Sequence, residues 1–305
     1  MVASFKEGEE LTNWLILGRN GQLGLTLANN LKESNIEFFA VGRDECDVTD
    51  LPSLLGLVEE IHPGVIVNAA AWTAVDLAED RVLEAFAANS DGARNAAIAA
   101  RACQARLIHV STDYVFAGDL DRPYEVDDVA IPKTVYGQSK LSGELAVTEE
   151  YYENSVIVRT AWLYSEYGSN FVKTVMRKAL NHEAMKVVCD QFGQPTSAAD
   201  LASHIVDLGV QHSCTGVLHG TNSGVSTWYD LAVSIYEMLD RDSTLVSSVS
   251  SDAFPTKAIR PRNSVLSHQR TASLGIPLMK DWRIALSEAL PIIFDTYIKD
   301  KRDEL

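Results

Sequence analysis

The chain has 305 residues, of which 46% are hydrophobic and 22% charged, and its formal net charge is −16. The composition is that of an ordinary globular protein and excludes extended disorder. The acidic balance argues against nucleic acid as a partner, because phosphate contacts require clustered Lys and Arg. Since the longest apolar runs fall short of the ~20 residues that span a bilayer, we expect no membrane partner either.

The N-terminal segment and the cysteines together indicate a cytoplasmic location. Residues 1–12 are acidic and lack the apolar stretch of a signal peptide, so we expect a leader or linker there. The four cysteines form neither a CxxC pair nor a Cys/His ligand spacing, which favours free thiols in a reducing compartment.

The first half of the chain alternates short apolar runs with helical patterns. This alternation predicts βαβ units and a parallel sheet. The apolar runs are continuous, as expected where helices cover both faces of a sheet. The predicted fold class is therefore α/β, a Rossmann-type doubly wound sheet. Strands are predicted at 14–17, 36–41, 65–67, 106–110 and 155–158, and helices at 22–32, 51–61, 85–103 and 132–148.

The pattern changes beyond about residue 160. Turn-rich segments there separate helices predicted at 171–181, 198–211 and 228–239. We expect residues 13–160 to form a dinucleotide-binding domain with later segments woven into it. Residues 161–305 should form mainly a smaller, discontinuous substrate-binding lobe.

A glycine-rich turn joins the first predicted strand to the first predicted helix. Backbone N–H groups at a helix N-terminus bind a pyrophosphate, aided by the helix dipole. Gly18 allows the tight turn, Gly21 the close approach of phosphate, and Gly24 the packing of the helix near the sheet. The spacing is GxxGxxG rather than the standard GxGxxG, and glycines also mark simple turns. The position between a strand and a helix is what indicates a dinucleotide site.

The choice between the two nicotinamide cofactors should be determined about twenty residues further on. Arg43 suits the 2′-phosphate of NADPH, while the following Asp44 leaves room for NADH. The alternative is that Arg43 merely faces solvent at a strand end. We favour NADPH, and expect Asp47 and Val48 to flank the adenine.

Tyr136 and Lys140 lie one turn apart on one face of a predicted helix. The ammonium is expected to lower the phenol pKa toward neutrality, and Lys can also hold the ribose of a cofactor. Thr112, on a loop after the fourth strand, would polarise a substrate carbonyl. A Tyr-x-x-x-Lys spacing is common on exposed helices. Its combination with Ser111-Thr112 at a strand end and with the glycine turn predicts a reductase.

The sequence resembles the extended short-chain dehydrogenase/reductases and, within them, the dTDP-4-dehydrorhamnose reductase family. The similarity runs continuously from Trp14 to about Phe294. It rests on the segments 68–76 (NAAAWTAVD), 111–116 (STDYVF), 136–140 (YGQSK), 159–162 (RTAW), 190–196 (DQFGQPT) and on Arg260, Pro261, Asn263, Ser264 and Leu266.

The resemblance implies NADPH-dependent reduction of C4 of a nucleotide sugar, dTDP-4-dehydro-6-deoxy-L-mannose, to dTDP-L-rhamnose. With this reaction in view, the acidic leader raises the hypothesis of an upstream epimerase, fused to this chain or acting with it. The resemblance makes Tyr136 the catalytic acid, Lys140 its partner and Thr112 the third member of the catalytic set. Thr112, Asp113 and Trp162 would contact the sugar, the indole offering a flat apolar face, although Trp162 could equally be a core aromatic. Gly18, Asn20, Gly21, Gln22, Leu23, Gly24, Arg43, Asp47, Val48, Ala71, Trp72, Thr73, Tyr136 and Lys140 would bind the cofactor.

The sequence departs from some relatives that are bridged as dimers through Mg²⁺ by glutamates. The matching positions here are Thr26, Ala199 and Ile292, which cannot supply carboxylates, so a Mg²⁺-bridged dimer is not expected. The histidines show no ligand spacing, and no metal is predicted.

Two alternatives remain open. A cofactor-binding regulatory subunit, similar to the β subunit of methionine adenosyltransferase, shares this fold, but the intact set of Tyr136, Lys140 and Thr112 favours catalysis. A reductase of another nucleotide-linked 4-keto sugar is the closer alternative, because base and epimer choice depends on contacts in the second lobe.

Overall fold

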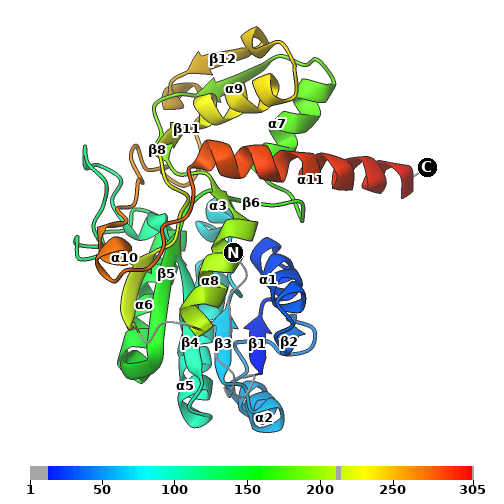
Figure 1. The fold of residues 1–305 in the computed structure, drawn as a ribbon. Helices are drawn as coiled ribbons and strands as arrows, with labels where there is room; N and C mark the ends of the chain where they lie inside the picture. The colour runs from blue at the N-terminus through cyan, green and yellow to red at the C-terminus, as the bar shows by residue number, and fades with distance from the viewer. Residues whose placement is uncertain (1–12, 211–213, 304–305) are drawn as a thin grey trace.

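A six-stranded parallel sheet forms the larger lobe of the computed structural model (Figure 1). The model describes residues 13–210 and 214–303, so the expected leader at 1–12 lies outside the described residues. The predicted α/β class is confirmed, and a strand from beyond residue 160 completes the sheet at one edge. In the order β10-β5-β4-β3-β1-β2, the strands are β10 (Gly216–His219), β5 (Ser155–Thr160), β4 (Arg106–Thr112), β3 (Val65–Asn68), β1 (Trp14–Leu17) and β2 (Phe38–Val41).

Helices cover both faces of this sheet, as the continuous apolar strands require. On one face α1 (Gln22–Glu33) and α8 (Ala198–Val210) pack over Ile16, Val67 and Val158. On the other face α2 (Leu51–Ile61), α5 (Gly92–Ala102) and α6 (Val135–Tyr151) pack over Leu15, Ile66 and Leu107.

The single helix predicted at 85–103 is wrong in detail. The structure has α4 (Val82–Phe86), a π-helical turn (Ala87–Asp91) and then α5. In the π turn the Asn89 carboxamide accepts a hydrogen bond from Trp72 N at 2.8 Å and donates one to the Ser139 hydroxyl at 2.9 Å. Widened turns of this kind aim one side chain away from the regular helical face. Here that side chain joins the segment after β3 to helix α6.

The smaller lobe is built by the second half of the chain and has its own apolar core, which includes Met176, Tyr236, Trp282 and Leu286. Figure 1 shows α7, α9 and β12 above the sheet and the long helix α11 running beneath them. No helix in the described ranges is long and apolar enough to cross a membrane. The elements of the smaller lobe are β6 (Leu163–Tyr164), α7 (Phe171–Leu180), β7 (Met185–Val188), β8 (Phe192–Gly193), β9 (Thr196–Ser197), β11 (Ser226–Thr227), α9 (Trp228–Met238), β12 (Val246–Val249) and α11 (Trp282–Asp303). The short helix α10 (Gln269–Ser273) lies beside β10 of the large sheet.

The strand order determines where a ligand can bind. From β1 the chain passes to β2 on one side and then crosses back to β3 on the other. In doubly wound sheets, ligands bind outside the carboxyl ends of the strands where the order reverses in this way. The glycine turn after β1 and the Ala69–Trp72 segment after β3 both lie at this point.

Candidate active site

Two cavities open at the carboxyl edge of the sheet and share Gly21, Ala69 and Ala71 in their walls. We name them the glycine-loop cavity, of about 530 Å³, and the tyrosine cavity, of about 490 Å³. Of the residues predicted from the sequence, the first is lined by Gly18, Asn20, Gly21, Arg43, Asp47, Val48, Ala71 and Trp72. The second is lined by Gly21, Gln22, Leu23, Ala71, Thr73, Thr112, Asp113, Tyr136, Lys140 and Trp162.

Gly24 lines neither cavity. A Cβ at Gly24 would lie 2.3 Å from the carbonyl oxygen of Gly18, so only glycine lets α1 start this close to the turn. Gly18 itself has φ +94°, a conformation that L side chains rarely adopt. Both glycines therefore shape the loop.

The N-terminus of α1 is arranged to receive an anion. The helix begins after Gly21, and within the described chain no side chain caps its first turn. The first N–H groups of a helix have no intrahelical partner, and together with the helix dipole they attract phosphate. The turn thus fits a pyrophosphate.

Two arginines, Arg43 and Arg81, line the glycine-loop cavity. The Arg43 side chain is 84% exposed, and its Nε lies 2.9 Å from the Asp47 carboxylate. Arg81 also lines this cavity and pairs with Glu84 at 3.7 Å. The solvent-facing alternative for Arg43 therefore describes its environment in the structure, and the residue also lines the cavity.

Helix α6 carries Tyr136 and Lys140 into the tyrosine cavity. The Thr134 hydroxyl accepts a hydrogen bond from Gly137 N at 3.0 Å and so fixes the helix start next to Tyr136. Lys140 is buried, and its Nζ donates a hydrogen bond of 2.6 Å to the carbonyl of Val110. Thr112 is the last residue of β4, so its predicted position on a loop is wrong. The strand pairing with β5 extends to Thr112 and holds its hydroxyl at the cavity wall.

The predicted lowering of the Tyr136 pKa is also wrong. Burial raises the pKa of this phenol to about 12, although a hydrogen bond with Thr112 opposes the rise. Burial lowers the pKa of Lys140 to about 8, against the attraction of the Glu144 carboxylate. Loss of water is the largest influence on the phenol, and the nearby Asp113 carboxylate raises its pKa further. The Lys140 ammonium instead donates its hydrogen bond to Val110 O. At neutral pH the pair thus consists of a protonated phenol and an ammonium ion.

A buried ion pair lies directly behind Lys140. Arg159 donates two hydrogen bonds to the Glu144 carboxylate, at 2.9 and 2.6 Å, and both side chains are at most 5% exposed. The Ser111 hydroxyl donates a third bond, of 2.5 Å, to the same carboxylate. Glu144 lies one turn after Lys140 on α6. Its bonds to Ser111 of β4 and to Arg159 of β5 hold the helix against both strands.

The predicted substrate residues occupy different parts of the tyrosine cavity. Asp113 is buried, and burial raises its pKa to about 6. Its Oδ2 has no hydrogen-bond partner among the described residues. Trp162 has φ 45° and stacks on Trp228, with ring centroids 3.7 Å apart and 9° between the planes. Trp228 covers one indole face, so at most the other is available to a sugar.

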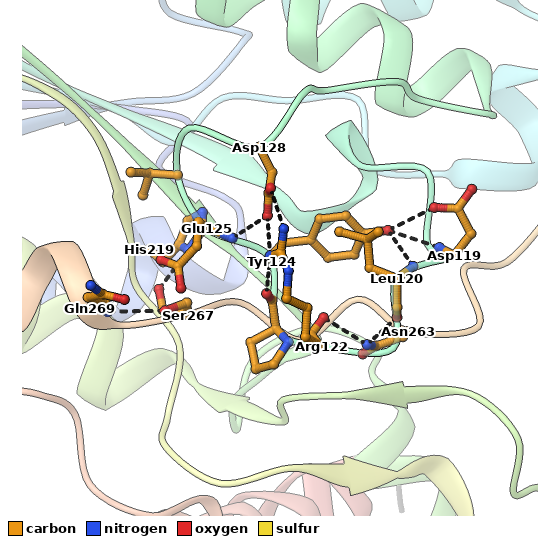
Figure 2. A network of polar contacts seen from close by, with 12 residues as sticks. Asp119, Leu120, Arg122, Tyr124, Glu125, Asp128, His219, Asn263, Ser267 and Gln269 are labelled. Carbon is orange, nitrogen blue, oxygen red and sulfur yellow. Dashed lines mark hydrogen bonds and ion pairs between the residues drawn. The ribbon is translucent and has the colours of Figure 1, made fainter.

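A long loop connects Thr112 to Tyr136, and a polar network holds it in place (Figure 2). Arg122 donates two hydrogen bonds, of 2.6 and 2.7 Å, to the Asp128 carboxylate and lowers the pKa of that carboxyl to about 2. The Tyr124 hydroxyl accepts hydrogen bonds from the backbone of Asp119 and Leu120. Asn263 donates to the Leu120 carbonyl at 2.7 Å. The network anchors the loop to the second half of the chain.

Sequence reasoning missed part of the tyrosine cavity. Thr160 ends β5 beside Thr112, lines the cavity, and its buried hydroxyl has no partner within the described ranges. Asn170, Phe171 and Trp228 form the wall on the side of the smaller lobe. Asn170 precedes a predicted helix and could have been found as a cap. No pattern in the sequence around Trp228 indicates that its side chain lines a ligand site.

In the described part of the chain, no three His, Cys, Asp or Glu side chains gather closely enough to hold a metal ion. Thr26 is buried, whereas Ala199 and Ile292 are exposed, and each of these three side chains lacks a carboxylate.

Comparison with known proteins identifies the family. A sequence model described as RmlD substrate binding domain matches residues 12–293. The chain belongs to this family. The resemblance seen in the sequence is thereby confirmed.

Two bacterial reductases are similar to this chain over nearly its whole length. The dTDP-4-dehydrorhamnose reductase of Streptomyces griseus is 42% identical over 284 residues, which cover 92% of this chain and 93% of the relative. The dTDP-4-keto-6-deoxy-D-glucose reductase of Streptomyces niveus is 41% identical over 280 residues, covering 92% and 97%.

The crystal structure of dTDP-4-dehydrorhamnose reductase from Bacillus anthracis, in complex with NADP, matches with a TM-score of 0.89. It is 36% identical and covers 92% of this chain and 99% of that one.

Proposed function

We propose that the chain reduces the C4 keto group of dTDP-4-dehydro-6-deoxy-L-mannose with NADPH and produces dTDP-L-rhamnose. The observation that carries this proposal is the placement of Tyr136, Lys140 and Thr112 in a cavity that shares a wall with the glycine loop. The family membership and the names of its relatives support it.

The residues present fit a nicotinamide dinucleotide. The uncapped first turn of α1 suits the pyrophosphate, and the glycine-loop cavity suits the adenosine end, with Asp47 and Val48 at its wall. The NADP complex of the Bacillus anthracis relative supports the phosphorylated cofactor. When bound, the nicotinamide supplies the hydride that adds to C4.

The side chains of the tyrosine cavity supply the proton and the orientation. The Thr112 hydroxyl, which donates to the Asp113 carboxylate at 3.0 Å in the structure, turns to donate its hydrogen bond to the keto oxygen. Tyr136 transfers its phenolic proton to that oxygen as the carbonyl becomes an alcohol. A phenol with a pKa of about 12 keeps that proton at neutral pH until negative charge develops beside it. The Lys140 ammonium stabilises the phenolate that remains. Asp113 and Trp162, which line the same cavity, hold the sugar ring.

The Streptomyces niveus relative, named for a 4-keto-6-deoxy-D-glucose substrate, favours a second candidate, the reduction of another dTDP-linked 4-keto sugar. A cytoplasmic location and an upstream epimerase that supplies the keto sugar are part of the same proposal. All four cysteines are free thiols, in agreement with a reducing compartment.

A competition assay tests the proposal. NADPH consumption is measured with dTDP-, UDP- and GDP-linked 4-keto-6-deoxy sugars, and with the dTDP-linked sugars of both D-glucose and L-mannose configuration. We expect turnover with the dTDP-linked L-mannose derivative to exceed all others. Preference for the D-glucose derivative supports the second candidate. NADPH binding without turnover of any sugar contradicts both and favours a regulatory subunit.

A further inference from the structure

Gln22 joins the two lobes at the active site. It is the first residue of α1 and lines the tyrosine cavity next to Gly21. Its Oε1 accepts hydrogen bonds from Asn170 Nδ2 at 2.9 Å and from the Ser165 hydroxyl at 3.2 Å. The first residue of the proposed pyrophosphate helix is thus tied to the smaller lobe.

The two partners of Gln22 belong to the wall on the sugar side. Asn170 caps α7, because its Oδ1 accepts a hydrogen bond from Lys173 N at 2.9 Å. Its Nδ2 also donates to the Ser165 carbonyl at 2.8 Å. The next residue, Phe171, packs edge-on against Trp228 with centroids 4.8 Å apart, and Trp228 stacks on Trp162. A change in the position of Asn170 therefore moves the aromatic wall of the cavity.

Both interlobe bonds go to the amide oxygen of Gln22. A glutamine amide also has two N–H donors, and no hydrogen bond joins them to another of the described residues, so they can meet an anionic ligand in the cavity that the side chain lines. One rigid amide plane can therefore contact the cofactor phosphates with its nitrogen and the smaller lobe with its oxygen. A ligand that orients the nitrogen also orients the oxygen and its two partners.

We propose that Gln22 is a positioning residue that couples cofactor binding to nucleotide-sugar binding. NADPH fixes the amide, the amide fixes Asn170 and Ser165, and the sugar-side wall is then arranged before the second ligand enters. The coupling is reciprocal, because each ligand must change the affinity of the other by the same factor. This inference rests on the proposed function, whose two ligands it connects.

The experiment measures NADPH dissociation constants by fluorescence titration of the full chain, with and without saturating dTDP-L-rhamnose. We expect dTDP-L-rhamnose to tighten NADPH binding to the unmodified protein about five-fold or more. Gln22→Met keeps the length of the side chain but neither accepts nor donates a comparable hydrogen bond, and should reduce the factor to about one. Asn170→Ser keeps a capping hydroxyl for α7 but is too short to reach Gln22, and should do the same. The double variant should lose nothing further.

Asn29→Ala is the matched control. Asn29 lies on the same helix and donates to the Tyr167 hydroxyl at 2.6 Å, another contact with the smaller lobe, but it lines neither cavity. The control should keep the coupling factor of the unmodified protein. If it loses the coupling as well, general contact between the lobes is responsible and the role of Gln22 is overturned.

Other outcomes separate this inference from the proposed function. An unmodified protein that binds NADPH and dTDP-L-rhamnose independently overturns the inference and leaves the reductase proposal intact. Full coupling in Gln22→Met or in Asn170→Ser overturns it as well. A protein that binds neither NADPH nor the nucleotide sugar contradicts the proposed function itself.

Discussion

Lys140 Nζ lies 2.6 Å from the carbonyl oxygen of Val110, and this bond sets the register of α6 on β4. One turn further along α6, Glu144 accepts the hydrogen bond of Ser111, the next residue of the strand. One turn before Lys140, Tyr136 lies opposite Thr112 in the same cavity. Three successive turns of α6 thus face Val110, Ser111 and Thr112 of β4. The placement of the Tyr136 phenol therefore depends on the bonds that Lys140 and Glu144 make to the strand.

Replacing Tyr136 by Phe should lower kcat about 100-fold or more while changing the NADPH dissociation constant little. The phenol supplies the proton in the transition state, and general acid catalysis contributes effects of this size. Stopped-flow measurement of NADPH oxidation and a separate cofactor titration distinguish the two quantities.

Tyr114→Phe is the control for this substitution. Tyr114 lines the same cavity and packs edge-on against Tyr136, with centroids 5.6 Å apart. It should lose much less activity, because Tyr136 keeps its hydroxyl. Equal losses in the two variants would show that Tyr136 is not the specific proton donor.

The rate of reduction should fall as pH rises through about 8, the value to which burial lowers the Lys140 pKa. Below that pH the ammonium is present and stabilises the phenolate, and above it the amine is neutral. The phenol itself ionises only near pH 12, outside the range of the experiment. The kcat/KM for the sugar, measured between neutral and alkaline pH at saturating NADPH, reports this transition.

Lys140→Met should be slow at every pH and should lack the alkaline decline. A decline that persists in this variant assigns the titration to another group. A decline displaced to the ordinary pKa of lysine, about 10.4, would mean that burial does not act on Lys140 as described.

The sequence predicted the parts of this site that depend on local pattern. The glycine turn, Tyr136 and Lys140 were found because a strand-to-helix junction and a helical spacing are visible within a few residues. The ion pair of Glu144 with Arg159 was not found, because the partners come from different elements and meet only after the sheet has formed.

The errors also have physical causes. Helix α11 was not predicted, since Pro291 interrupts a segment whose apolar face is weakly patterned. The pKa of Tyr136 was predicted from one neighbour, whereas burial, which the sequence does not give, decides its direction. Trp162 was expected to offer an open face, but Trp228 from a distant helix covers one side. The roles of the site residues stay predictions.

Arg43→Ala should weaken NADPH binding about ten-fold more than NADH binding. The exposed guanidinium, now paired with Asp47, can turn to the 2′-phosphate, and a hydrogen bond between charged groups contributes about 1.5–3 kcal/mol. Dissociation constants for both cofactors give the ratio directly.

Arg81→Ala tests the other arginine at the same cavity. It should affect NADPH and NADH alike. If Arg81→Ala changes the ratio and Arg43→Ala does not, the 2′-phosphate lies on the helix α4 side of the cavity.

Glu144→Leu should lower the free energy of unfolding by about 3–5 kcal/mol, because it leaves the Arg159 guanidinium buried without its carboxylate. Urea denaturation measures the change.

Glu149→Leu, on the same helix, is the control. Glu149 is 68% exposed where it pairs with Arg94, and an exposed pair contributes at most about 1 kcal/mol. The double variant Glu144→Leu/Arg159→Met should recover part of the loss, since it removes both charges together. A single variant as stable as the unmodified chain would mean that water reaches Arg159, and that the contact between Glu144 and Ser111 does not hold α6 in register.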